Sequence, residues 1–249
     1  MSVEAWFARC DEVLERIRGT QLAAIRRAAE LIATAAESGG GVHFFDTGHC
    51  SGEAIHRAGG LCMLRPLRFS LQVETHAAPQ RAQETAARRE GSRDRLDEEL
   101  AALAVERSDL APGDVLIMSS VSGKSASVVE LALAAQRMGA KVVAITSVTY
   151  SRAVRSRHSS GKRLLEVAEI VVDNCGEVGD AVLDMEGVDT AVAPTSGVAF
   201  CYIIWAVVAE AVARMLARGI RPHVYRSINL PDGEEFNAHA EAAYRETGV

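Results

Sequence analysis

The stretch PGDVLIMSSVSGKSASVVELALAAQRMGAKVVAITS, residues 112–147, decides the fold of this chain. Its apolar run Asp114–Met118 follows a Pro-Gly turn and predicts a short strand that is buried on both faces. Apolar residues at helical spacing follow over residues 126–137, and Gly139 ends that pattern. Lys141–Thr146 is a second buried run. Strand, helix and strand in this order predict an α/β fold.

Residues 120–125, which we call the serine turn, join the first strand to the helix. A helix that opens directly after such a turn presents free backbone N–H groups, and its dipole favours negative charge there. Serine hydroxyls add donors, and a glycine lets the backbone come close to a ligand. The sequence therefore predicts an anion site whose expected ligand is phosphate. The residues predicted to form it are Ser120, Ser122, Gly123, Lys124 and Ser125.

Two other interpretations of the serine turn were weighed. A serine at this place can serve only as the N-cap of the helix. Gly123-Lys124-Ser125 also matches the end of the P-loop G-x-x-x-x-G-K-[ST], but the opening glycine of that motif falls on Met118, inside the apolar run. A P-loop is therefore not expected, and dinucleotide binding has no support because no G-x-G-x-x-G follows a strand.

The serine turn, SVSGKS, resembles the S-x-S-G-x-[ST] loop of the sugar isomerase (SIS) domain family. The resemblance spans about residues 42–230 and is shared with stand-alone proteins labelled sugar isomerase domain-containing. It implies a three-layer, flavodoxin-like SIS fold with a mainly parallel sheet of about five strands. It also implies a helical extension over residues 1–40, the SIS domain over 41–230 and a helical tail over 231–249. The motifs that carry it are FFDTGH (Phe44–His49), RAGG (Arg57–Gly60), PGDVLI (Pro112–Ile117), HSSGKRL (His158–Leu164), DNCG (Asp173–Gly176), PTS (Pro194–Ser196) and RSIN (Arg226–Asn229).

A similar unit stands earlier in the chain. Gly41–Asp46 predicts a strand, and residues 47–52, the cysteine turn, lead into a predicted short helix at Glu53–Ala58. In SIS domains this turn contacts the phosphosugar, which implies binding roles for Gly48, His49, Cys50 and Ser51. Cys50 stands where the family usually has a serine, so either Ser51 serves instead or one contact is lost. A cysteine near a helix N-terminus can have a lowered thiol pKa, which leaves a catalytic thiol as an alternative.

Glu53 resembles the acidic residue that precedes RAGG in the family, and we expect it to act as a general base. It is equally suited to be a favourable acid in the first turn of a helix. With His49 and His56 it also has the spacing of a metal site. Because His49 falls in the turn and not on the predicted helix, we expect no metal.

The loop Ser147–Arg163 is a basic island in an acidic protein, suited to attracting an anionic substrate. It is either an exposed flexible loop or, as the resemblance implies, a lid or a subunit contact. His158 is its side chain best suited to proton transfer, and we expect it to act as the acid. Thr195 and Ser196 start a long helix, and in SIS domains hydroxyls at this place approach the ligand; for Thr195, capping alone is the alternative.

The remaining elements are predicted from periodicity. Residues 3–37 are expected to be helical, with Gly19-Thr20 as the place where the helix can be interrupted. The family resemblance implies that this helical segment forms a dimer surface, and packing alone is the alternative. We expect the stripe Leu96, Leu100 and Leu103 to face the sheet. Two helices are expected besides the long helix from Pro194 to about Arg218: one at Glu84–Glu106, which Gly91-Ser92 can break, and a last one in the tail. The other predicted elements are a strand at Leu61–Leu64 with an extension at Phe69–Val73, a strand at Glu169–Val172, and either a strand pair or one bent strand at Ala181–Met185 and Val188–Val192.

The composition of the chain limits its expected partners and cellular compartment. The net charge of −6 over 249 residues argues against nucleic acid as a general partner. Five widely spaced cysteines favour free thiols in a reducing cytoplasm. The charged N-terminus lacks the apolar core of a signal peptide, and Gly197–Ala209 is too short to span a bilayer, so it is expected to be a buried helix.

The function predicted is an aldose–ketose phosphosugar isomerase. Ser51, Ser120, Ser122 and Ser125 would hold the phosphate, Glu53 and His158 would move protons, and no cofactor is required. The partners expected are a phosphosugar and further copies of the chain, as a homodimer or homotetramer. A non-catalytic sugar-phosphate sensor and a sugar-phosphate etherase (lyase) on the same scaffold are the alternatives.

Overall fold

The computed structural model covers residues 1–249 and describes all of them except Met1, Ser51, His76 and Ala77. In the described part of the chain, a five-stranded sheet has the order β2-β1-β3-β4-β5, and every neighbouring pair is parallel. The predicted α/β fold with a mainly parallel sheet is therefore confirmed. The strands are β1 (Val42–Asp46), β2 (Leu64–Pro66), β3 (Val115–Ser119), β4 (Lys141–Thr146) and β5 (Ile170–Asp173).

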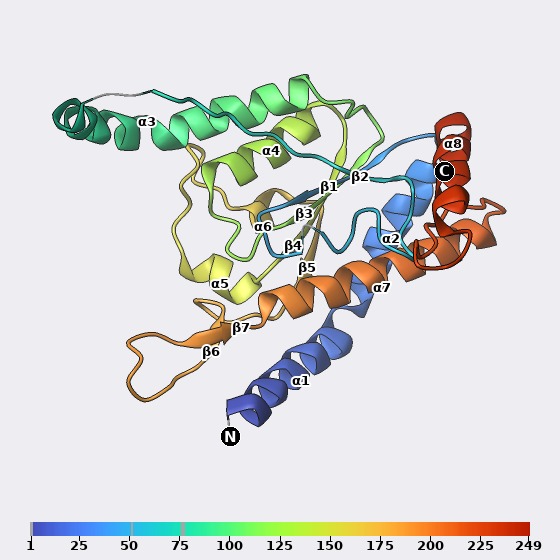
Figure 1. The fold of residues 1–249 in the computed structure, drawn as a ribbon, viewed down its shortest axis with the longest axis horizontal. Helices are drawn as coiled ribbons and strands as arrows, with labels where there is room; N and C mark the ends of the chain where they lie inside the picture. The colour runs from blue at the N-terminus through green and yellow to red at the C-terminus, as the bar shows by residue number, and fades with distance from the viewer. Residues whose placement is uncertain (1, 51, 76–77) are drawn as a thin grey trace.

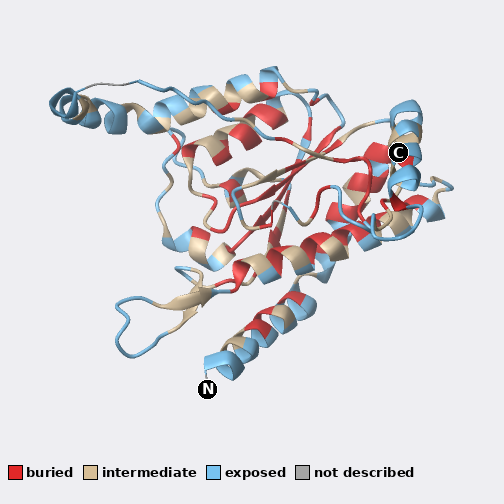
Figure 2. Ribbon diagram, viewed as in Figure 1, coloured by how far each residue is buried: buried red, intermediate tan, exposed pale blue. Residues whose placement is uncertain are grey.

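Helices cover both faces of this sheet and make the three layers (Figure 1). One face is packed by α1 (Ser2–Thr20), α2 (Leu22–Glu37) and α7 (Ser196–Ala217), whose buried side chains form one apolar cluster with the sheet. The other face is packed by α3 (Pro79–Glu106), α4 (Ala126–Arg137) and α6 (Leu164–Val167). Figure 2 shows the buried residues gathered on the strands and on the helix sides that face them.

The unit that decides the fold forms as its sequence predicts. β3 and β4 are almost entirely buried, because helices cover both faces of the sheet at its centre. α4 connects them and buries Val128, Val129 and Leu131. Its first residue is Ala126, directly after the serine turn, so the predicted strand, turn and helix are all in place.

The short helix predicted at Glu53–Ala58 is wrong: the residues described there form turns and bends. The chain is drawn instead towards a distant segment, since Gly59 N–H donates to Tyr225 O at 2.8 Å and Tyr225 N–H donates to Gly60 O at 2.9 Å. Ala54 and Ile55 are buried in the core, and His56 has a φ of +55° that no right-handed helix allows.

Other boundaries also differ from the predictions. Residues 69–73 are not a strand, and Leu71 and Val73 are largely exposed. α3 begins at Pro79 and continues through Gly91-Ser92 without a break. Its expected stripe is wrong, because Leu96 and Leu103 are about half exposed while the small side chains of Ala101 and Val105 are buried against α4.

The loop expected at residues 147–163 contains a short helix, α5 (Val148–Ala153). A hairpin of β6 (Ala181–Leu183) and β7 (Val192–Pro194) follows β5, and α8 (Gly233–Thr247) ends the chain. Within the described residues one helix, α7, is long and apolar enough to cross a membrane. It packs against α2 and buries Phe200, Ile203 and Ile204, as a core helix does.

Candidate functional site

Several polar residues meet at the carboxyl ends of the strands. The register pairs Asp46, the last residue of β1, with Ser119, the last of β3. It also pairs Thr146 at the end of β4 with Asp173 at the end of β5. β1 and β3 are the neighbours between which the strand order reverses, and ligands of open α/β sheets bind outside such a point. The cysteine turn and the serine turn leave the sheet there, next to each other.

The serine turn carries a run of donors without acceptors. Within the described residues, the backbone N–H groups from Val121 to Val128 make no hydrogen bond. The hydroxyls of Ser120, Ser122 and Ser125 make none either, and Ser125 occupies the N-cap position of α4 without a side-chain capping bond. Capping alone therefore does not explain these serines, and the turn is a concentrated set of donors at a helix N-terminus.

The carbonyl groups of the serine turn, by contrast, are fixed to neighbouring segments. Val121 O accepts hydrogen bonds from Thr146 Oγ1 and Ser147 N–H, both at 2.9 Å. Gly123 O accepts one from Leu164 N–H at 2.8 Å. These carbonyl groups are therefore bound within the protein, while the N–H groups of the same turn from Val121 onward have no partner among the described residues. The turn is thus held rigid before any ligand arrives.

Position 123 requires glycine because of a contact with a distant residue, which the sequence did not predict. Its φ is +57°, and a Cβ built there would lie 2.9 Å from Leu164 Cβ. The close approach that this glycine permits is therefore to the segment before α6, whatever else binds on the opposite side.

The cysteine turn has its donors occupied. The Asp46 carboxylate accepts the N–H groups of Gly48 at 3.0 Å, His49 at 3.2 Å and Cys50 at 3.1 Å. It also accepts the hydroxyl of Ser119. The sequence predicted that these N–H groups would face an anionic ligand at the start of a helix. In the structure no helix follows among the described residues 52–58, and the chain's own carboxylate accepts the three N–H groups. Ser51 lies outside the described residues.

Cys50 lies in surroundings that disfavour a thiolate. Its side chain is buried, and burial together with the nearby Asp46 charge raises the pKa of the thiol to about 12. The lowered pKa considered from the sequence is wrong, because the turn ends without a helix and its N–H groups face the Asp46 carboxylate.

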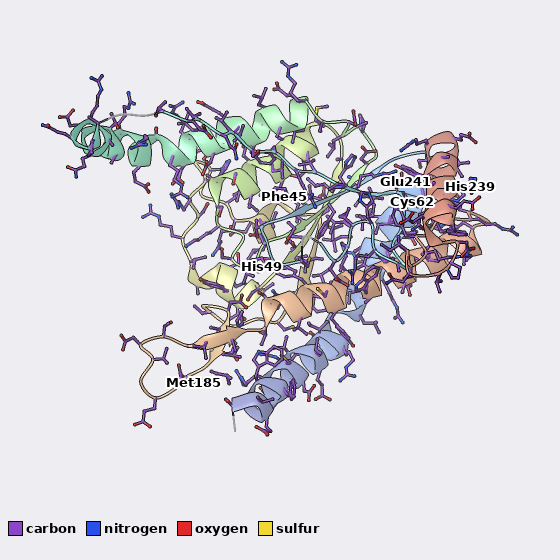
Figure 3. The ribbon with its side chains drawn as sticks, in the orientation of Figure 1. Phe45, His49, Cys62, Met185, His239 and Glu241 are labelled. Atoms are coloured by element: carbon purple, nitrogen blue, oxygen red, sulfur yellow. The ribbon has the colours of Figure 1, made fainter. Side chains whose placement is uncertain are left out.

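His49 reaches the N-terminus of α7, 147 positions along the chain (Figure 3). Its Nδ1 lies 3.2 Å from Ser196 Oγ, and its ring packs on Phe200 with the centroids 5.2 Å apart. Ser196 is in turn held by Asp180 from the loop before β6. The neighbouring Thr195 Oγ1 is buried with no hydrogen-bond partner and makes no cap, so capping does not explain this hydroxyl.

Glu53 lies between two cavities. The first, about 750 Å³, is lined by His49, Glu53 and the exposed side of α7, including Tyr202 and Trp205. The second, about 560 Å³, joins Glu53 to the RAGG and RSIN segments. The Glu53 carboxylate is partly exposed and lies 3.4 Å from Arg57 Nη2. A third cavity, about 720 Å³, lies at the opposite, N-terminal end of the strands and shares none of these residues.

His158 lies away from these cavities, against α3 and α4. Its Nε2 donates to Glu130 at 2.9 Å, and its Nδ1 accepts Ser160 N–H at 3.0 Å, so both ring nitrogens are engaged. Its side chain is 5% exposed. The same loop is anchored to the serine turn by Arg157 N–H, which donates to Lys124 O at 2.9 Å. The arrangement suits a residue that holds the loop in place.

The metal site considered from the spacing of His49, Glu53 and His56 does not form. Among the described residues, no group of three or more His, Cys, Asp or Glu side chains is placed to hold a metal ion.

Comparison with known proteins decides the family. The family model described as SIS domain matches residues 5–147. The chain belongs to the SIS domain family. UPF0309 proteins are relatives over nearly the whole length: one of Streptomyces griseus is 35% identical over 237 residues, covering 94% of this chain and 91% of its own. One of Geobacillus thermodenitrificans is 33% identical over 247 residues, covering 98% and 95%.

Solved structures show the same SIS fold. Phosphoheptose isomerase GmhA from Neisseria gonorrhoeae superposes with a TM-score of 0.52 at 18% identity, covering 85% of this chain and 97% of its own. A phosphoheptose isomerase from Francisella tularensis gives 0.50 at 16% identity, covering 84% and 96%.

Within this SIS domain chain, sequence reasoning missed Asp46 and Asp180 as site residues. Asp46 lies in the FFDTGH motif, and its place directly after a strand was an available signal. Asp180 lies in the turn-rich segment after β5, and only the fold brings it to Ser196.

Proposed function

We propose that the chain binds a phosphosugar at the carboxyl edge of its sheet, with the phosphate on the serine turn. The observation that carries this proposal is the run of N–H groups from Val121 to Val128 that have no partner among the described residues, next to the equally unpartnered hydroxyls of Ser120, Ser122 and Ser125. A phosphate dianion supplies several acceptors to one place, as such a set of donors requires. Lys124 adds a positive charge.

We propose further that the bound sugar undergoes aldose–ketose isomerisation. The reaction moves one proton between C1 and C2 and one between their oxygens, so it needs no oxidant, reductant or cofactor. Glu53 is the proposed base at carbon, because it is partly exposed and lines both cavities next to the cysteine turn. His158 is assigned to holding the loop 156–164, since neither ring nitrogen is free.

The proposal is tested with a panel of phosphosugars, first by thermal stabilisation and then by turnover. Ser122→Ala should weaken binding of the stabilising ligand roughly tenfold or more, because hydrogen bonds to charged groups contribute about 1.5–3 kcal/mol. Ser92→Ala is the matched control, since that hydroxyl bonds only carbonyl groups of its own helix. Unchanged affinity in Ser122→Ala contradicts the site.

Turnover separates the classes of function. A ligand that is converted between aldose and ketose supports the isomerase. A ligand that stabilises the protein and is never converted indicates a sensor, and release of an acid from a sugar ether indicates an etherase.

We also propose that the protein works in the cytoplasm as a homodimer or homotetramer. Val3, Phe7 and Leu22 leave large apolar areas of α1 and α2 exposed, at 60%, 56% and 49%. Light scattering should give a mass of two or four times 26.6 kDa. A single copy in solution contradicts this assignment.

A further inference from the structure

The carboxylate of Asp180 holds Ser196 at two points. Its Oδ1 accepts the Ser196 backbone N–H at 3.0 Å, and its Oδ2 accepts the Ser196 hydroxyl at 2.5 Å. Asp180 itself has a φ of +70°, a conformation that few residues other than glycine adopt. Ser196 is 2% exposed, so water does not compete for these bonds.

The single proton of the Ser196 hydroxyl determines the protonation of His49. An ionised carboxylate can only accept hydrogen bonds, so the hydroxyl must use its proton on Asp180. It can then only accept from His49 Nδ1, 3.2 Å away. His49 Nδ1 therefore carries a proton, and in the neutral ring Nε2 carries the lone pair.

The His49 side chain lines a cavity that Glu53 also lines, and its second ring nitrogen, Nε2, is available there. Within the described residues, Nε2 has no hydrogen-bond partner, and the ring is held against Phe200. The other titratable groups around it are Asp46, which accepts the His49 backbone N–H, and Glu53, Cys201 and Tyr202, which line the same cavity.

We propose that His49 is the second proton-transfer group of the site and that Asp180, through Ser196, is the residue that sets its tautomer. The inference rests on the proposed isomerase function. His49 Nε2 takes the proton from one sugar oxygen and returns it to the neighbouring oxygen, while Glu53 moves the proton between the carbons. Protons and electrons balance over the cycle, and both groups end in their starting states. Asp180 touches no substrate and is a positioning residue.

The test begins with the tautomer, which does not depend on activity. Nitrogen NMR of ¹⁵N-histidine-labelled protein, assigned with His49→Gln, should show His49 with a protonated Nδ1 and an unprotonated Nε2 at a pH where the ring is neutral. In Asp180→Asn the amide donates to Ser196, the hydroxyl proton turns to Nδ1, and the tautomer should shift to protonated Nε2. Asp184→Asn, an exposed aspartate in the hairpin after β6, should leave the spectrum unchanged.

Kinetics on a converted phosphosugar complete the test. Asp180→Asn should lower kcat about 10- to 100-fold with KM within about twofold, and His49→Gln should lower kcat about 100-fold or more. The double variant should lose no more than His49→Gln alone. Ser196→Ala is the second route if Asp180→Asn does not fold.

The outcomes are distinguishable. An unshifted His49 tautomer in the Asp180 and Ser196 variants, or additive losses in the double variant, overturns the inference. If no phosphosugar is converted, the proposed isomerase fails, while the tautomer shift still decides whether Asp180 sets the state of His49.

Discussion

Replacing Gly123 by alanine should damage both the stability of the fold and the serine turn. The residue has a φ of +57°, so an alanine there is strained whatever space surrounds it. Its Cβ would in addition lie 2.9 Å from Leu164 Cβ. Leu164 is fully buried, and its Cβ is fixed to the backbone, so the contact is relieved only by moving the segment that carries it.

Two contributions make up the expected loss in the free energy of unfolding of Gly123→Ala. The left-handed conformation costs a non-glycine residue about 1–2 kcal/mol, and forcing atoms into a packed site costs about 1–3 kcal/mol. Gly123→Ala should therefore lower the free energy of unfolding by roughly 3 kcal/mol, which for a chain of this size lowers Tm by about 6–12 °C. Leu164 N–H also holds Gly123 O, so the turn should move with it and lose affinity for its ligand.

Gly161→Ala provides the matched control. Gly161 has a φ of +73° and lies in the loop before α6, but nothing lies within 4 Å of the position of its Cβ. It should lose about 1 kcal/mol from the backbone contribution alone. Urea and thermal unfolding of both variants measure the difference. Equal losses, or a larger loss in Gly161→Ala, would refute the idea that Leu164 supports the serine turn.

Two further predictions follow from shifted pKa values. The Cys50 thiol, with a pKa of about 12, should resist iodoacetamide at pH 8 in the folded protein and react in urea; mass spectrometry measures the modification, and equal rates in both states contradict the burial. The Glu166 carboxyl has its pKa lowered from 4.5 to about 2, chiefly by the Arg163 side chain, so the pair stabilises the fold above pH 4.5 and this contribution is lost as the pH falls towards 2. Since Glu166 is 38% exposed, Glu166→Gln should cost only about 0.5 kcal/mol at pH 7, and urea unfolding from pH 7 down to 3 should show the difference from wild type shrinking; a constant difference contradicts the assignment.

The parts of the fold that follow from local pattern were predictable from the sequence. β3, α4 and β4 lie where the apolar runs and the helical spacing place them, because strands buried on both faces need continuous apolar residues. The serine turn was also predictable, because its residues are adjacent in the chain and directly follow a predicted strand. Parallel pairing then brought it next to β1 without further information.

The features that depend on distant contacts were not predictable. Residues 53–58 have a helical pattern, yet the pairing of Gly59 and Gly60 with Tyr225 holds the chain in another path. The contact of His49 with Ser196 joins segments 147 positions apart. His158 has the chemistry of an acid, but only its packing against Glu130 shows that its nitrogens are occupied.

The two turns look alike in the sequence and have opposite electrostatic states in the fold. In the cysteine turn, the Asp46 carboxylate already takes the N–H groups, so a phosphate there would lose those donors and face a negative charge. Two unit charges about 4 Å apart repel by about 4 kcal/mol at an effective dielectric constant of about 20. This difference is why the proposed phosphate site is the serine turn, whose donors have no such occupant among the described residues.

The cysteine turn is instead proposed to position His49. Asp46 fixes the backbone of His49, and Asp180, through Ser196, fixes its ring. Because Asp46 and Ser119 are register partners, the turn that carries His49 and the serine turn follow adjacent strands. The proposed function therefore requires a phosphosugar whose phosphate binds the serine turn to reach His49 and Glu53 with its carbons. The carboxylate that occupies the donors of this turn therefore also fixes the backbone of the proposed proton-transfer residue, His49.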